Sequence, residues 1–314
     1  MSPEQGPVSK VIPLRMADFN LCLDRLRPKI GNYDWMWHIL RVRARKTGFP
    51  PHKLFPLMRR FTLAARPYFI GRMANGVQFV GNVHDDYSLG KLLSPTIHEP
   101  LIEFIIGKMK ERSGAYLDIG TNMGVIAVTV ALALPDSFVI AFEPGAETGM
   151  RAMATFALNK LNNLTLYPCA LGDSDEVLTF YNAPGHSDYA SANPTETSVG
   201  VVWEETHVEC RKLDTLHDAV GPVAVMKIDV EGHELKVLQG AQALLAADRP
   251  HVALEYNHRI APKMGWSAVD LVPVVNGATP YSIHTLEDDL TLSAFPPPHR
   301  NSGVVNLYCQ PEEA

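Results

Sequence analysis

The 314-residue sequence predicts an α/β fold in which helices cover both faces of a mostly parallel sheet. Two observations carry this prediction. From about residue 115 onward, short apolar runs typical of buried strands alternate with longer apolar or amphipathic runs typical of helices. The composition, 46% hydrophobic and 20% charged, is that of an ordinary globular domain. In such a sheet a ligand binds at the carboxyl ends of the strands, where the strand order switches.

The first part of this alternation predicts two β-α-β units. Ala115–Ile119 is a short buried strand, and Val125–Leu134 is apolar on all sides, as expected for a helix between the sheet and its cover. A second strand follows at Phe138–Phe142. The next helix repeats apolar residues at the 3.6-residue period over 146–161, and Leu164–Ala170 is the third strand.

The second part begins with a polar interruption. Glu176–Tyr181 is expected to be a strand, whereas 182–206 is rich in Ser, Thr, Asn and Pro and is expected to be a long loop. This loop contains His186–Ser191, which are candidates for a lid over the acceptor or else part of an exposed variable loop. The elements predicted beyond it are strands at Val223–Val230, His251–Tyr256 and Gly303–Tyr308, and helices at His233–Leu245 and Trp266–Val275.

The first 75 residues differ from the rest of the chain. Helical signals at Met16–Leu26 and Tyr33–Arg45 are interrupted by several prolines, which break helices. The turn signal Asn75-Gly76 then precedes strand-like sequence. The sequence therefore divides into an irregular helical extension, 1–75, and a main domain, 76–314.

Composition and charge exclude several classes of partner. The formal net charge of −6 argues against nucleic acid, because duplex binding needs a basic face. No apolar run approaches the roughly 20 residues of a membrane span, and the first ten residues lack the pattern of a secretory signal. Four scattered cysteines are expected to be free thiols. These features predict a cytoplasmic protein that has no membrane partner.

The most informative segment is the loop after the first strand, residues 118–124 (DIGTNMG). Gly120 and Gly124 permit positive φ and let a ligand approach the backbone. Asn122 stands where a dinucleotide fingerprint has its second glycine, and no Gly-Lys-Ser/Thr follows, so the spacing disfavours NAD and the P-loop. Asp118, two residues before the first glycine, suits an ammonium group such as that of S-adenosylmethionine. This loop, including Thr121, is therefore a candidate binding site for that cofactor, although many cofactors use a turn of this kind.

Two acidic residues follow the next strands. Glu143 lies 23 residues beyond Gly120, where a carboxylate at the tip of the adjacent strand reaches ribose hydroxyls. Asp173 follows the third strand and is a candidate for the adenine amine, or else a turn residue.

Four segments together resemble the FkbM family of methyltransferases: LDIGTNMG (117–124), IAFEP (140–144), ALGD (170–173) and MKIDVEGHELKVLQG (226–240). In that family an asparagine is usual at the position of Asn122. The resemblance implies a Rossmann-like sheet of seven strands whose last strand is antiparallel. It also implies S-adenosylmethionine as the methyl donor and, most often, a hydroxyl as the acceptor. The first 70 residues and the polar loop fall outside the resemblance.

Candidates for the chemistry cluster at the predicted ends of the fourth and fifth long strands. Asp229 is assigned to the cofactor, while Glu231, His233 and Glu255 are candidate bases for the proton that an acceptor hydroxyl loses. His233 is alternatively a polar residue at a helix start. These side chains could instead hold a divalent metal that orients a diol, but neither the spacing nor the resemblance requires one, and none is expected. His98–Glu99 are candidates for the border of the site or for a helix cap.

The sequence therefore predicts an S-adenosylmethionine-dependent enzyme that O-methylates a small molecule, such as a sugar or a natural-product intermediate. N- or carboxyl-methylation, a non-catalytic cofactor-binding module and an NAD oxidoreductase are the alternatives. The sequence gives no route to the oligomeric state.

Overall fold

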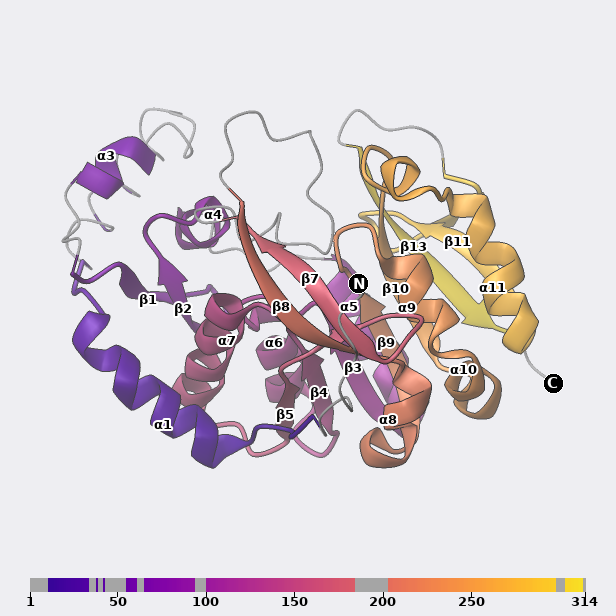
Figure 1. Cartoon of the computed structure of the whole chain (residues 1–314), viewed down its shortest axis with the longest axis horizontal. Coiled ribbons are helices and arrows are strands. Elements are labelled where there is room, and N and C mark those ends of the chain that lie inside the picture. Colours follow the sequence, from indigo (N-terminus) through magenta and orange to yellow (C-terminus); the bar gives the residue numbers. More distant parts are fainter. Residues whose placement is uncertain are drawn as a thin grey trace, which may run out of the picture.

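The computed structural model describes residues 11–33, 38, 42, 55–60, 65–93, 100–183, 203–297 and 303–312. Its centre is an eight-stranded sheet (Figure 1). In spatial order the strands are β12 (Leu292–Ser293), β11 (Tyr281–Leu286), β13 (Val304–Pro311), β10 (His251–Asn257), β9 (Val223–Ile228), β3 (Ala115–Ile119), β4 (Val139–Phe142) and β5 (Leu164–Tyr167).

The strand directions confirm the Rossmann-like α/β prediction. β10, β9, β3, β4 and β5 are parallel, and β13 runs antiparallel between β10 and β11. The chain moves outward from β3 in one direction through β4 and β5, then crosses to β9 on the other side. The switch point therefore lies between β3 and β9. Without the two-residue β12, the sheet has seven strands, the number that the family resemblance implies. One of these seven, β11, was not predicted from the sequence pattern.

Helices cover both faces of this sheet, and each face has its own hydrophobic cluster. Successive residues of β3 point to opposite faces, as the pleat requires: Tyr116 joins one cluster, whereas Leu117 joins the other. The first face is covered by α1 (Met16–Leu26), α5 (Pro100–Glu111), α6 (Val125–Ala133) and α7 (Ala146–Asn159). The second is covered by α8 (Leu213–Val220), α9 (Glu234–Gln239), α10 (Gln242–Asp248) and α11 (Leu271–Ala278).

The N-terminal segment packs on the first face. Helix α1 occupies the predicted range, and Phe19 meets Phe156 of α7 edge-on, with ring centroids 5.2 Å apart. A hairpin of β1 (Tyr68–Arg72) and β2 (Gln78–Asn82) follows. The proposed boundary between residues 75 and 76 therefore falls within one hairpin. The helix expected at Tyr33–Arg45 lies almost entirely outside the described residues.

A second, three-stranded sheet has the order β6 (Ala170–Leu171), β8 (Glu204–Arg211), β7 (Glu176–Asn182). Strand β7 confirms the prediction, but β8 begins inside the segment expected to be a polar loop. The third predicted strand, Leu164–Ala170, is also shorter than expected. β5 ends at Tyr167, and Ala170 pairs with Cys210 of β8 instead of continuing along β4.

The helix predicted at His233–Leu245 is two helices, α9 and α10. Gly240 ends α9, and a Cβ at this glycine would lie 1.9 Å from the carbonyl oxygen of Gly172. The backbone thus packs directly against the segment that follows β6. The helix predicted at Trp266–Val275 begins instead at Leu271, after a 3₁₀ turn at Ala268–Asp270.

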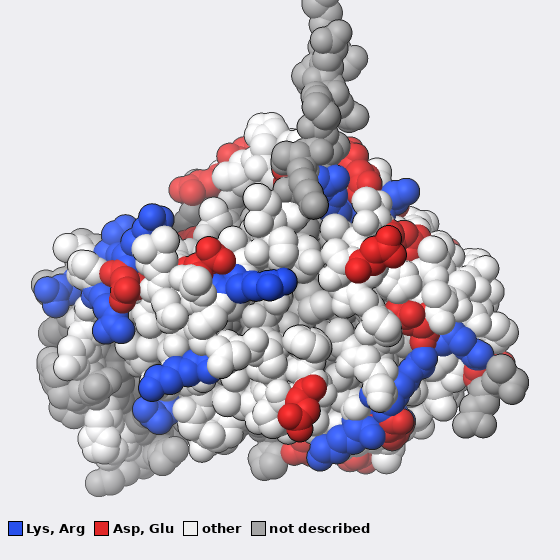
Figure 2. All heavy atoms as spheres, turned by 90° about the horizontal axis from the view of Figure 1, so that it is seen from below, with Lys and Arg blue, Asp and Glu red and all other residues white. Residues whose placement is uncertain are grey.

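Basic and acidic side chains are interspersed over the face shown in Figure 2, among the residues that the structure describes. Within those same residues, no helix combines the length and the apolar character that a membrane crossing requires.

Candidate active site

A cavity of about 370 Å³ lies at the carboxyl ends of β3, β4, β9 and β10, beside the switch in strand order. This is the place where open α/β sheets bind ligands, and the volume falls in the range of small-molecule pockets. The polar side chains that line it are Tyr87, Thr121, Asn122, Glu143, Lys227, Asp229, Glu231, His233, Glu255 and Asn257.

The predicted cofactor loop forms one wall of this cavity. Gly120 and Gly124 have φ of 78° and 80°, and Asn122 has φ of 52°, so three of its residues adopt the left-handed region. A Cβ at Gly120 would lie 1.8 Å from the carbonyl oxygen of Asp229. The loop can therefore close on the end of β9 only because residue 120 has no side chain.

Glu143 lines the cavity at the end of β4, as predicted, and is buried. Its carboxylate accepts hydrogen bonds from Asn122 N (2.8 Å), Gly145 N (2.9 Å) and Thr148 Oγ1 (2.7 Å). Burial raises the pKa of Glu143, and these three hydrogen bonds oppose the rise by stabilising the ionised form. Glu143 thus fixes the glycine loop and presents a hydrogen-bond acceptor to the cavity.

Asp118 lies beneath the loop and is not among the described residues that line the cavity. Its side chain is fully buried, accepts a hydrogen bond from Thr121 Oγ1 (2.7 Å) and forms an ion pair with Lys227 Nζ (3.4 Å). The expected contact with a ligand ammonium is therefore replaced by a contact with a lysine of this chain. Asp118 supports the loop from below.

Lys227 is a residue that sequence reasoning missed. It is buried in β9, donates to the carbonyl oxygen of Gly120 (3.0 Å) and forms ion pairs with Asp118 and Asp229 (3.2 Å). Burial alone would lower the pKa of Lys227, but the Asp229 and Asp118 carboxylates raise it above its ordinary value. The lysine stays charged and ties the glycine loop to the end of β9. The sequence did contain a sign of this role, because Lys227 is the one charged residue in the otherwise apolar strand Val223–Ile228.

Asp173, the candidate for the adenine amine, does not line the cavity. It is exposed, and its carboxylate lies 3.8 Å from Lys236 Nζ. The reason is the early end of β5: residues 170–171 join the second sheet, and this carries Asp173 away from the tip of the main sheet. The wall near this point is apolar instead and is formed by Cys169, Ala170, Leu171, Leu178 and Phe180.

The four cysteines are free, as predicted. Burial raises the pKa of Cys169, which lines the cavity, to about 12. This thiol is therefore uncharged at neutral pH and contributes apolar surface.

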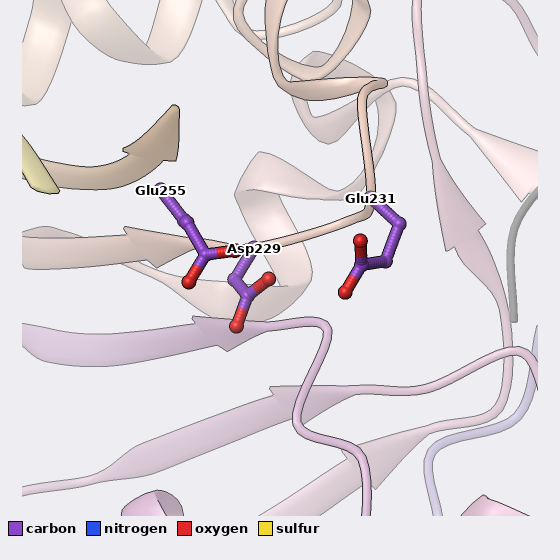
Figure 3. Close-up of side chains that lie close together, drawn as sticks. All are labelled: Asp229, Glu231 and Glu255. Carbon is purple, nitrogen blue, oxygen red and sulfur yellow. The ribbon is translucent and has the colours of Figure 1, made fainter. Parts of the chain in front are cut away.

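Asp229, Glu231 and Glu255 all line the cavity, and Figure 3 shows that their side chains lie close together. One carboxylate oxygen from each lies within 4.8 Å of the others. β9 ends at Ile228, so strand alternation does not bring Asp229 and Glu231 together. The turn after the strand does, with φ of 54° at Glu231. Oxygen ligands at this spacing could hold a divalent cation, although the sequence gives no reason to expect one.

Glu234, which sequence reasoning also missed, holds this turn. Its buried carboxylate accepts hydrogen bonds from the backbone N–H groups of Val230 (3.0 Å) and Gly232 (3.1 Å). Burial raises the pKa of Glu234 to about 7. Glu234 is the last residue of the KIDVEGHE segment (227–234), and its place in that segment was the available sign of a role at the site.

His233 lines the cavity at the start of α9 and makes no side-chain cap there. Its Nδ1 has no hydrogen-bond partner among the described residues. Burial lowers the pKa of His233 to about 4, and nearby Lys236 acts in the same direction. The imidazole is therefore neutral at pH 7.

Tyr87 contributes to the cavity from α4 (Asp86–Leu93), a helix that the sequence did not predict. The residue before this helix, Asp85, forms a buried ion pair with Arg151 of α7 (2.8 Å), which also donates to Ser88 (2.7 Å). Burial raises the pKa of Tyr87, so the phenol stays protonated. The candidates His98, Glu99 and His186–Ser191 lie outside the described residues.

The neutral state of His233 predicts a pH dependence of stability. Because its folded pKa is lowered to about 4 from 6.5, the unfolded chain binds the proton first, and stability is lost as pH falls through this range. His233→Gln removes this contribution, so its unfolding free energy should fall less steeply than that of the wild type between these pH values. Urea unfolding at several pH values measures the difference between the two curves.

The two curves have to be compared because Glu234 has the opposite effect on the unfolding free energy. Its pKa is raised to about 7, so its contribution to the stability of the protein is lost as the pH rises towards 7. His284→Gln on β11, outside the cavity, is the matched control. Parallel wild-type and His233→Gln curves would contradict the assignment of a neutral His233.

Residues 118–279 match the model of the "Methyltransferase FkbM domain". This range is more than half of the 314 residues and contains every cavity residue named above except Tyr87. The chain belongs to the FkbM methyltransferase family. The family match thus covers the glycine loop, Glu143 and the three converging carboxylates, and it leaves α4 and the N-terminal segment outside.

One curated relative is "Methyltransferase 1" of Beauveria bassiana (strain ARSEF 2860). It is 29% identical over 141 residues, a match that covers 40% of this chain and 57% of the relative. The chain therefore matches little more than half the length of that protein.

Two solved structures are similar to this FkbM-family chain. Methyltransferase FkbM from Methylobacillus flagellatus KT has a TM-score of 0.40 and 17% identity, covering 63% of this chain and 43% of that one. The O-methyltransferase TomG from Streptomyces achromogenes has a TM-score of 0.38 and 14% identity, covering 67% and 78%. The fold assignment rests on the strand order of the sheet.

Proposed function

We propose that this protein is an S-adenosylmethionine-dependent methyltransferase that methylates a hydroxyl group of a small molecule. One observation carries the proposal: the glycine loop and Glu143 face one cavity at the switch point of the sheet, within the family match. A cytoplasmic location stays a prediction from the sequence.

The residues present fit the donor. Gly120 and Gly124 leave the loop backbone without side chains, and the Glu143 carboxylate at the tip of β4 can accept hydrogen bonds from ribose hydroxyls. The half-buried Asp229 carries negative charge toward the cavity, which suits a ligand with a sulfonium and an ammonium group. When bound, the donor supplies a methyl group already activated by its positive sulfur.

The protein then has to align the acceptor, exclude water and take up one proton. Transfer of the methyl group to an alcohol would release the hydroxyl proton, which a base on the cavity wall would take up. His233, whose Nδ1 has no hydrogen-bond partner among the described residues, is our candidate for that base, and Glu231 and Glu255 also lie on the cavity wall.

The carboxylates favour an alcohol over an amine as acceptor. An amine bound close to Asp229, Glu231 and Glu255 would be held in its protonated form, because nearby negative charge raises its pKa. A protonated amine has no free lone pair for attack. A hydroxyl is neutral throughout and donates a hydrogen bond to the same groups.

Glu143→Gln tests the donor site. The substitution keeps the size of the side chain but removes its charge, so hydrogen bonds to the loop and to a ribose both weaken. Charge-assisted hydrogen bonds contribute about 1.5–3 kcal/mol, so affinity for S-adenosylmethionine should fall at least about tenfold. Titration calorimetry measures it, and Glu103→Gln, an exposed glutamate on α5, is the matched control. No binding by the wild type, or equal binding by Glu143→Gln, would contradict the proposal.

A further inference from the structure

Tyr87 brings a hydroxyl group into the cavity from outside the segment that the family model matches. It is half-buried and lines the cavity from α4, whereas the match begins at residue 118. No residue in the described part of the chain accepts a hydrogen bond from this hydroxyl. Burial raises the pKa of Tyr87, so the phenol keeps its proton at neutral pH. The hydroxyl is therefore available to donate a hydrogen bond to a ligand.

The start of α4 is fixed relative to the glycine loop. Asp85 and Arg151, both almost fully buried, form an ion pair of 2.8 Å, and Arg151 also donates to Ser88 Oγ (2.7 Å). Ser88 Oγ lies 3.8 Å from Met123 Sδ, which belongs to the loop. Tyr87 stands between Asp85 and Ser88 in the chain, so its backbone is held beside the loop by buried groups. A side chain placed in advance in this way lowers the entropy that ligand binding has to offset.

The charges around Tyr87 suit an anionic ligand group that lies next to a cationic one. After burial, Lys227 and Asp229 have the largest effects on the pKa of Tyr87, and they act in opposite directions. Both groups therefore lie within electrostatic range of the phenol, and they form an ion pair with each other (3.2 Å). Lys91 Nζ lies 5.4 Å from the centroid of the Tyr87 ring. Two ammonium groups are thus close to Tyr87, and one of them also offsets Asp229.

The amino-acid end of S-adenosylmethionine carries an ammonium and a carboxylate on the same carbon atom. A cavity that binds this end has to accept hydrogen bonds from the ammonium and donate hydrogen bonds to the carboxylate. Asp229 offers an acceptor. Two of the cavity's hydrogen-bond donors are engaged, because Lys227 contacts Asp118, Asp229 and the Gly120 carbonyl, and Thr121 Oγ1 donates to Asp118. Tyr87 offers a donor that no described residue uses, within range of the Lys227–Asp229 pair.

We propose that the Tyr87 hydroxyl donates a hydrogen bond to the carboxylate of S-adenosylmethionine. The inference rests on the proposed function and gives it a ligand-binding residue outside the family match. The carboxylate takes no part in methyl transfer, so the same contact forms with S-adenosylhomocysteine, the product that the methyl donor leaves behind. Tyr87 therefore acts in binding and takes up no proton.

Titration calorimetry on the full-length protein tests this contact with two ligands. One is S-adenosylhomocysteine, and the other is S-adenosyl-3-thiopropylamine, the same molecule without its carboxylate. Tyr87→Phe removes the hydroxyl and keeps the ring. Its affinity for S-adenosylhomocysteine should fall at least about tenfold, the loss expected for one hydrogen bond to a charged group. Its affinity for the ligand without a carboxylate should stay within about twofold of the wild type.

Tyr281→Phe is the matched control. Tyr281 is a buried tyrosine of β11 outside the cavity, and its hydroxyl donates to the carbonyl oxygen of Pro250 (2.9 Å). This variant also loses one tyrosine hydroxyl, but it should bind both ligands as the wild type does. A difference between the two variants then reports on the cavity and not on the general cost of removing a buried hydroxyl.

The outcomes separate the inference from the proposed function. Equal affinity of Tyr87→Phe and the wild type for S-adenosylhomocysteine overturns the inference. A loss of the same size for both ligands also overturns it, because the hydroxyl then acts through packing or through another part of the ligand. Equal affinity of the wild type for the two ligands would show that the carboxylate is not bound at all. If the wild type did not bind S-adenosylhomocysteine, the proposed function itself would be contradicted.

Discussion

Lys227→Met is expected to lower the unfolding free energy by about 3–5 kcal/mol, the range for breaking a buried ion pair by removing one partner. The substitution keeps a long side chain in β9 but leaves the fully buried Asp118 without its counter-charge. It also removes the donor to the Gly120 carbonyl. Urea unfolding monitored by circular dichroism measures the change.

Lys236→Met is the matched control, since this lysine is half exposed and lies 3.8 Å from the exposed Asp173. Exposed ion pairs contribute roughly 0–1 kcal/mol, so the control should unfold almost as the wild type does. Equal stability of the two variants would show that Lys227 does not hold the site together.

Gly120→Ala is expected to abolish saturable binding of S-adenosylmethionine. The added Cβ would lie 1.8 Å from the Asp229 carbonyl oxygen, a separation that neither backbone can accommodate without moving. The loop must then withdraw from the end of β9, and its hydrogen bonds to Glu143 and Lys227 are lost with it. Titration calorimetry at concentrations that saturate the wild type measures binding.

Gly76→Ala separates this collision from the cost of a left-handed backbone. Gly76 has φ of 91° in the β1–β2 turn, and a Cβ there would meet no atom within 4 Å. Its substitution therefore costs only the left-handed penalty of about 1–2 kcal/mol, and ligand affinity should not change. If Gly120→Ala bound the donor within about twofold of Gly76→Ala, the close packing of the loop would not matter for binding.

The sequence predicts the parts of the site whose signals are local. The strand at Ala115–Ile119, the glycine loop and Glu143 follow one another along the chain, and each occupies the place that its pattern indicates. Glu231, His233 and Glu255 also line the cavity as predicted, because strand ends are marked by the change from apolar to polar residues.

The parts that could not be predicted depend on the pairing of distant segments. Asp118 and Lys227 are direct neighbours on adjacent parallel strands, and only the register of β3 against β9 turns a ligand-binding acid into the partner of a buried lysine. Asp173 was misplaced for a similar reason: the sequence does not show that Ala170 leaves the main sheet to pair with Cys210. Strand β8 begins with Glu204-Glu205-Thr206, which is indistinguishable from the polar loop before it.

The packing of Phe156 shows that the segment matched by the family model, residues 118–279, depends on contacts with residues outside it. Phe156 fills the space beside Gly124 of the glycine loop and also contacts Phe19 of α1. Strand β10 has β13, from beyond residue 279, as its second neighbour. A protein cut to residues 118–279 would expose Phe156 and leave β10 as an open apolar edge, which invites aggregation. The segment that the family model matches is therefore shorter than the segment that this chain needs for a stable fold.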